Sequence, residues 1–138
     1  MRYQHYKSLR WFRITVGLGF VGNMIFVLPA LFAPRYLETL IEVGTTNTLH
    51  WLQNVGILLL IITIMYIPAI KDPFRYLFIS YLLVAGRFSA GLLFLLGVLF
   101  MNYPSGMLVL SGSDLILSSI QAVLLYFMLR DGDPRAVY

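Results

Sequence analysis

The sequence predicts an all-α integral membrane protein whose four spans form an up-down helical bundle with both termini in the cytoplasm. Apolar residues make up 59% of the 138-residue chain, and charged residues make up only 12%. Soluble domains carry about a quarter charged residues, and a chain this short cannot hide so much apolar surface in one core. Lipid must therefore cover part of it. We expect one membrane domain, residues 1–138, because no soluble domain or domain-sized repeat is present.

Four apolar stretches approach or exceed the roughly 20 residues that cross a bilayer. The first ends before Pro34, and the second carries Pro68 in its last turn. The third opens with Asp72-Pro73, a helix N-cap residue followed by proline at the first helical position. The fourth follows the turn-forming sequence at residues 102–106. The expected spans are residues 14–32, 49–70, 73–101 and 107–129.

The basic residues predict the orientation of these spans, because cytoplasmic segments are enriched in lysine and arginine. In an up-down bundle, only Arg35 falls on the outer side, beside Glu38 and Glu42. The cytoplasmic side receives Arg2, Lys7, Arg10, Arg13, Lys71, Arg75, Arg130 and Arg135.

The segment between the first two spans resembles a short amphipathic helix lying on the outer surface. Tyr36, Leu37, Leu40 and Ile41 would share one helical face, and Glu38 and Glu42 would project from another. Such a helix either connects the spans and seals the end of the bundle, or forms a lid over a cavity.

Glycines 17, 19 and 22 match the dinucleotide-binding pattern G-x-G-x-x-G. That pattern needs a strand before it and a helix after it, whereas here it lies within a membrane span. Small residues that let helices approach closely are the better interpretation. Gly86 and Ala90 give a similar surface in the third span.

The most informative residues are polar groups at membrane depth. Arg87 lies near the middle of the third span, where burying an arginine costs about 2.5–3.5 kcal/mol on insertion scales. Asp114 lies roughly 10 Å along the fourth span, given a rise of ~1.5 Å per residue. A polar stripe on that span must face the bundle interior, because lipid offers no hydrogen-bond partners. It consists of Ser111, Asp114, Ser118 and Gln121.

The other two spans also carry polar residues. His50 and Asn54 lie one turn apart near the outer end of the second span, and Asn23 lies about halfway through the first. The predicted ligand-binding pocket opens outward and contains Arg87, Asp114, Asn54, Gln121, Ser118, His50 and Asn23.

An ion pair between Arg87 and Asp114 would make this cluster structural. Counted outward from Pro104, Arg87 lies deeper by ~12 Å, and its side chain leans further inward. A direct pair would therefore need irregular geometry or an intervening water or ligand. A structural network and a ligand site both remain open.

Metal and haem sites are not expected. Glu-x-x-His spacing is absent from the sequence, and the two histidines, His5 and His50, fall on opposite membrane faces in this topology. The chain has no cysteine for thiolate ligands. No serine–histidine–acid arrangement is apparent, so an enzyme built from this chain alone is not favoured.

Segments from the second to the fourth span, about half of the chain, resemble the DoxX-like group of small four-helix membrane proteins. The residues that carry the resemblance are Ile64-Met65-Tyr66, Lys71-Asp72-Pro73-Phe74-Arg75-Tyr76, Gly86-Arg87 and Ser113-Asp114-Leu115. The resemblance implies the four-helix fold and an association with membrane redox systems as an accessory subunit. Some relatives use cysteines, and this chain departs from them in having none.

The leading hypothesis is a non-catalytic accessory or binding subunit with an interior polar site for an amphipathic ligand, such as a quinone or a lipid head group. The alternative is a small oligomeric transporter in which Asp114 titrates. We expect the chain in a prokaryotic cytoplasmic (inner) membrane, with membrane lipid and a homo-oligomer or larger membrane complex as partners. Nucleic acid is not expected.

Overall fold

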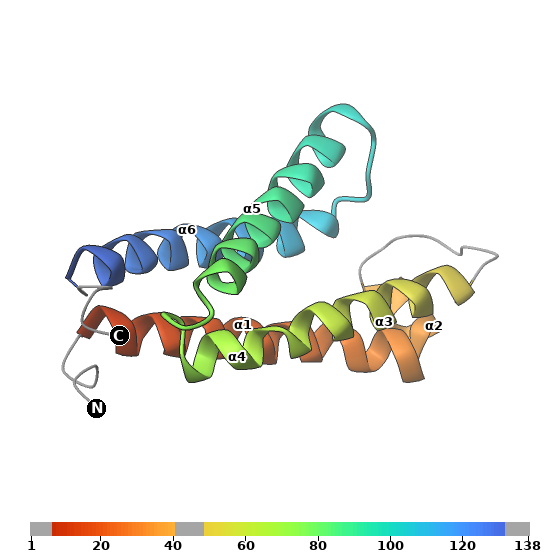
Figure 1. Cartoon of the computed structure of the whole chain (residues 1–138). Coiled ribbons are helices and arrows are strands. Elements are labelled where there is room, and N and C mark those ends of the chain that lie inside the picture. Colours follow the sequence, from red (N-terminus) through yellow and green to blue (C-terminus); the bar gives the residue numbers. More distant parts are fainter. Residues whose placement is uncertain (1–6, 41–48, 132–138) are drawn as a thin grey trace.

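The structure is a computed structural model that describes residues 7–40 and 49–131, where all regular structure is helical (Figure 1). Four helical stretches in this part of the chain are long and apolar enough to cross a membrane, as expected of an integral membrane protein. The elements are α1 (Lys7–Phe32), α2 (Pro34–Leu40), α3 (Leu49–Ile64), α4 (Tyr66–Lys71), α5 (Leu77–Phe100) and α6 (Met107–Asp131).

Helix α1 is central to the packing, because it contacts α2, α3, α4 and α6. Helix α5 packs mainly against α6 and also against α4. In Figure 1, α1, α3 and α6 run lengthwise through the molecule, whereas α5 leaves the others at an angle. The start of α1 and the end of α6 lie at the same end of the molecule.

The second span reaches Lys71, as expected, but one residue interrupts its helix. Helix α3 ends at Ile64, a turn at Met65 follows, and α4 begins at Tyr66. Pro68 explains the break, because its ring lacks an N–H and clashes with the carbonyl four residues earlier, which is that of Ile64. Pro68 is thus tolerated in the last turn of the span, as expected, with a one-residue interruption of the helix at Met65. The break matters for the site, since Tyr66 is buried beside it.

The third span also starts later than expected. Asp72 caps a separate turn, in which its Oδ1 accepts a hydrogen bond from Arg75 N at 3.1 Å and its carbonyl accepts one from Tyr76 N at 3.1 Å. Helix α5 begins only at Leu77. The Oγ of Ser80 donates to the carbonyl of Pro73 at 3.3 Å and fastens the turn to the helix. The fourth span begins at Met107, as predicted.

A short helix follows the first span, as predicted. Leu37 and Glu38 are buried, whereas Tyr36 and Leu40 are exposed. The helix packs through Leu37, on its expected apolar face, against the ends of α1 and α3, and Glu38, expected to project from another face, is buried as well. Ile41 and Glu42, the other residues assigned to those faces, lie outside the described residues.

Two apolar clusters flank the centre of the molecule. The smaller is formed by Ala30, Leu37 and Leu52, under α2. The larger joins α1, α4, α5 and α6 near the start of α1, and comprises Leu9, Phe12, Val16, Tyr66, Ala69, Leu83, Leu125 and Met128. Arg87 contacts Gly19 and Asn23, which lie along α1 between Val16 of the larger cluster and Ala30 of the smaller one.

Candidate functional site

The guanidinium of Arg87 is held by groups from three other helices. Its Nη2 donates to the carbonyl of Gly19 at 3.2 Å, to Asn23 Oδ1 at 2.8 Å and to the hydroxyl oxygen of Tyr66 at 3.3 Å. Its Nη1 lies 3.1 Å from Asp114 Oδ1, and only 4% of the side chain is exposed. The cost of an arginine at this depth is thus offset within the protein.

The ion pair is direct, although counting residues outward from Pro104 separated the two groups by ~12 Å. Gly91 is the reason: a Cβ there would lie 2.9 Å from Leu115 Cγ and 3.1 Å from Asp114 Cβ, so Asp114 is opposite residue 91. Arg87 then lies one helical turn from that point, about 6 Å at 1.5 Å per residue. An extended arginine spans this distance. Ser111 fixes the same register, since its Oγ donates to the carbonyl of Gly91 at 2.7 Å.

A second layer of hydrogen bonds orients Asn23. Its Nδ2 donates to Thr63 Oγ1 at 3.0 Å, and the Thr63 hydroxyl donates to the carbonyl of Leu59 at 2.6 Å. With Nδ2 committed to Thr63, the amide oxygen faces Arg87. Sequence reasoning singled out Asn23 but missed Thr63 and Tyr66. A threonine and a tyrosine near Pro68 in an apolar helix were the available signals.

Next to this network lies a cleft of about 350 Å³ between α1, α3, α5 and α6. Its polar lining residues are Asn23, Arg87, Ser113 and Asp114. A smaller extension of about 170 Å³ continues along α5 to Tyr66 and Gly86. The rest of the cleft wall is apolar or glycine: Gly22, Phe26, Val55, Leu58, Leu59, Ile62, Ala90, Phe94, Leu110 and Leu117. An apolar chamber with a few polar groups on one side is typical of sites for small ligands.

The two halves of the ion pair are not equally accessible. Asp114 keeps 21% of its side chain exposed, against 4% for Arg87. Among the described residues, none accepts a hydrogen bond from the buried Arg87 Nε. The carboxylate is therefore the charged group that a molecule in the cleft would meet.

Gln121 and Ser118 belong to the predicted polar stripe of α6, and the structure buries both fully. Gln121 lies close to the Arg87 network, because a Cβ on Gly19 would be 3.0 Å from Arg87 Nη2 and 3.6 Å from Gln121 Nε2. That nitrogen donates to the carbonyl of Thr15 at 3.0 Å. Neither residue lines the cleft. Gln121 instead ties α6 to α1.

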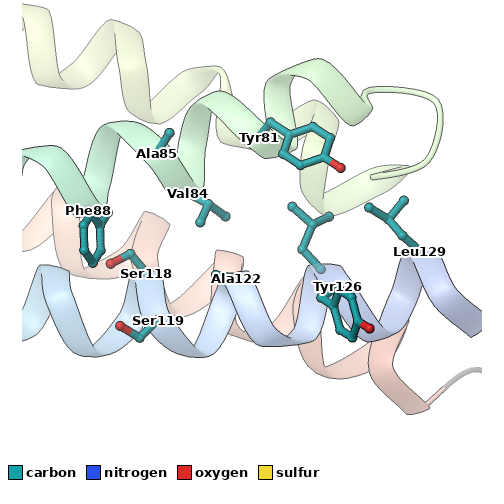
Figure 2. A pocket seen from close by; sticks show the side chains of 10 residues that line it. Tyr81, Val84, Ala85, Phe88, Ser118, Ser119, Ala122, Tyr126 and Leu129 are labelled. Carbon is teal, nitrogen blue, oxygen red and sulfur yellow. The ribbon is translucent and has the colours of Figure 1, made fainter.

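Ser118 faces a second groove, of about 580 Å³, between α5 and α6. Figure 2 shows Ser118 beside Phe88, with Tyr81 and Tyr126 further along the groove. The Ser118 hydroxyl donates within its own helix, to the carbonyl of Leu115 at 3.2 Å. The stripe thus faces the protein interior, as predicted. Its members face different places, because Asp114 lines the cleft and Ser118 lines the groove between α5 and α6.

His50 and Asn54 do not join the cluster. Both are exposed, and neither lines the cleft. Helix α3 presents Val55, Leu58, Leu59 and Ile62 to the cleft instead. The spacing of His50 and Asn54 correctly placed them on one helical face, but spacing does not determine where that face points. Their neighbour Gln53 does turn inward, and its Nε2 donates to the carbonyl of Leu31 at 3.3 Å.

The glycine pattern of α1 has one member at the site. Gly19 lies against Arg87, so its missing side chain makes room for the guanidinium. Gly17 and Gly22 have open space where a Cβ would be, and Gly22 lines the cleft. Gly86 is likewise open, so it makes no close helix contact of the kind predicted for it. The close helix contacts are made by Gly56, against Ala30 and Leu31, and by Gly91.

Within residues 7–40 and 49–131, no three histidine, aspartate or glutamate side chains are grouped so as to hold a metal ion. His5, one of the two histidines considered for haem, lies outside these residues. Comparison of the chain with protein families, curated proteins and solved structures gives no match. The resemblance to DoxX-like proteins therefore stays a prediction.

Proposed function

We propose that this protein binds a small amphipathic molecule, quinone-like or lipid-like, in the cleft beside Arg87 and Asp114, as a non-catalytic subunit of a membrane assembly. The observation that carries the proposal is an apolar chamber of about 350 Å³ with an ion pair on one side. A purely structural ion pair needs no such chamber next to it, because close packing would stabilise it better.

Two glycines on α1 offer a matched test of this proposal. A side chain at Gly22 would enter the cleft, whereas one at Gly17 would not, and a Cβ meets nothing within 4 Å at either position. Gly22→Leu should therefore fill the chamber without touching Arg87 or Asp114. Gly17→Leu is the control.

The measurement is lipid-soluble material retained by the chain after purification in native membrane discs, identified by mass spectrometry. We expect Gly22→Leu to lose a molecule that the parent and Gly17→Leu retain. Arg87→Met and Asp114→Asn should weaken retention of the same molecule. Equal retention by the parent and both glycine variants would refute a ligand site in the cleft.

Transport is the competing function, and the exposure of Asp114 to the cleft favours it. A small oligomeric carrier would use this carboxylate as its titrating group. Proteoliposomes carrying the parent chain would then show pH-dependent flux that Asp114→Asn removes. Liposomes inactive in flux, together with Gly22-dependent retention, would favour the binding subunit.

We also propose the orientation expected from the sequence, with up-down spans, cytoplasmic termini and a prokaryotic cytoplasmic membrane. It is supported by basic residues at the start of α1, the end of α4 and the end of α6. A hydrogen bond joins the first two of these regions, because Arg13 Nη2 donates to the carbonyl of Lys71 at 2.7 Å. A chain without cysteine suits labelling with an impermeant maleimide. Thr39→Cys should react in intact cells, and Tyr76→Cys only after permeabilisation; the reverse pattern would refute the orientation.

Membership of a redox complex would appear as a co-purifying cytochrome or dehydrogenase.

A further inference from the structure

Resting on the proposed cleft, we infer that its ligand presents a hydroxyl group, and not a bare carbonyl or an anion, to Asp114. The inference comes from which hydrogen-bonding groups are already engaged and which still face the chamber.

An anionic head is the first candidate that the site disfavours. The nearest cation, Arg87, is neutralised by Asp114 at 3.1 Å and also donates to three neutral oxygens. Only 4% of its side chain is exposed, whereas Asp114 is exposed to 21%. An anion in the cleft would therefore approach a carboxylate before it reached the guanidinium, and like charges at close range repel in a low-dielectric site.

A bare carbonyl is disfavoured for a related reason. A carboxylate only accepts hydrogen bonds, and so does a carbonyl oxygen. The contact with Arg87 engages Oδ1 of Asp114, whereas a carboxylate offers about four acceptor sites over its two oxygens. Ser113, the other polar residue of α6 in the cleft, already donates its proton to the carbonyl of Leu110 at 2.8 Å. Both side chains therefore offer acceptors.

A hydroxyl matches these groups, because it donates one hydrogen bond and accepts others. Its proton would go to Asp114, in a charge-assisted hydrogen bond of the stronger class. Its oxygen would accept from Asn23, whose Nδ2 has two protons and gives one to Thr63 at 3.0 Å. An ammonium group would satisfy Asp114 but has no acceptor for Asn23.

The apolar wall of the cleft indicates the chemistry of the remainder of the ligand, beyond its hydroxyl group. Aromatic and aliphatic side chains from all four long helices surround the chamber, Phe26 and Phe94 among them. They suit either an alkyl chain that ends in an alcohol or an aromatic ring that carries a phenol. Both are hydroxyl-bearing apolar molecules, and the experiment distinguishes them.

The test compares each hydroxyl compound with its methyl ether, which keeps the shape of the molecule but cannot donate. The probes are 1-hexadecanol and hexadecyl methyl ether for the aliphatic arm, and 4-dodecylphenol and 4-dodecylanisole for the aromatic arm. Binding to the full chain in nanodiscs is measured by equilibrium exchange of the labelled probe. Gly22→Leu defines binding in the cleft, with Gly17→Leu as its control.

We expect at least one hydroxyl compound to bind about tenfold more tightly than its ether, the weight of one charge-assisted hydrogen bond. Asp114→Asn should bring the affinity of the hydroxyl compound close to that of its ether. Binding in the cleft, which is the part that Gly22→Leu removes, should persist in this variant. A preference for hexadecanol over its ether would identify the ligand as an aliphatic alcohol, and a preference for dodecylphenol over its ether would identify it as a phenol.

Gly22-dependent binding with equal affinities for hydroxyl and ether would overturn the hydroxyl inference and leave the proposed cleft function standing. A preference for both ethers would overturn it in the same way. Binding of all four probes that Gly22→Leu does not change would overturn the proposed function itself, and the inference with it.

Discussion

The contacts of Arg87 predict strong energetic coupling between this residue and Asp114, which a double-mutant cycle measures. Arg87→Met keeps a long apolar side chain but removes every donor that reaches Gly19, Asn23, Tyr66 and Asp114. The carboxylate is then left in the protein interior without its cation. Losing one partner of a buried pair costs about 3–5 kcal/mol in soluble proteins.

The second single variant should cost less. Asp114→Asn retains an oxygen that can accept from Arg87, and the guanidinium keeps its three neutral acceptors. The loss is then the difference between a charge-assisted and a neutral hydrogen bond, about 1 kcal/mol. In the double variant no carboxylate is stranded, so the two costs should not add. Polar couplings measured in membrane helices reach about 1.7 kcal/mol, and we expect this pair to lie between about 1 and 2 kcal/mol.

The assay is reversible unfolding in mixed micelles by titration with sodium dodecyl sulfate, followed by circular dichroism. Arg75→Met, combined with Asp114→Asn, supplies the control cycle, because Arg75 is exposed and stacks on Tyr76 at 5.7 Å. In this control cycle, the losses of unfolding free energy caused by the two single substitutions should add to within about 0.5 kcal/mol. Equal coupling in the two cycles would refute the argument that the interior pair acts as a unit.

Two further predictions concern the backbone. Gly97→Ala should destabilise the fold by about 1–3 kcal/mol, the range for overpacking, because the Tyr103 ring occupies the place of its Cβ; Gly17→Ala, with open space, should change stability little, and equal unfolding midpoints would contradict this. Pro68→Ala should let α3 and α4 join, since residue 68 regains an N–H for the carbonyl of Ile64. Hydrogen exchange would then find the new amide protected, whereas fast exchange there would show that the break has another cause.

The membrane spans were predictable from the sequence because lipid imposes length and apolarity on each helix. The fourth span illustrates this: it starts at the expected Met107 and buries Ser111, Ser118 and Gln121 on one side. Boundaries set by local backbone chemistry were harder to predict. Asp72 was expected to be the N-cap of the third helix, but its side chain caps a turn before α5, whose N-cap is Tyr76.

The site was predictable in its components and not in its assembly. A charge or amide at mid-depth must find a partner inside the protein, which singled out Asn23, Arg87 and Asp114. Which residues meet depends on how helices cross, and here a single glycine, Gly91, sets the register that pairs the charges. Counting residues from Pro104 has no access to such a contact. It therefore separated two groups that lie 3.1 Å apart.

The order in which the partners of Arg87 occur along the chain has a consequence for biogenesis. Gly19, Asn23 and Tyr66 all precede Arg87, and only Asp114 follows it. A ribosome therefore delivers three oxygen ligands to the bilayer before the arginine leaves the translocon. The third span then enters a membrane that already holds the three oxygen atoms that accept hydrogen bonds from Arg87. The carboxylate of Asp114 pairs with the guanidinium when the last helix is inserted.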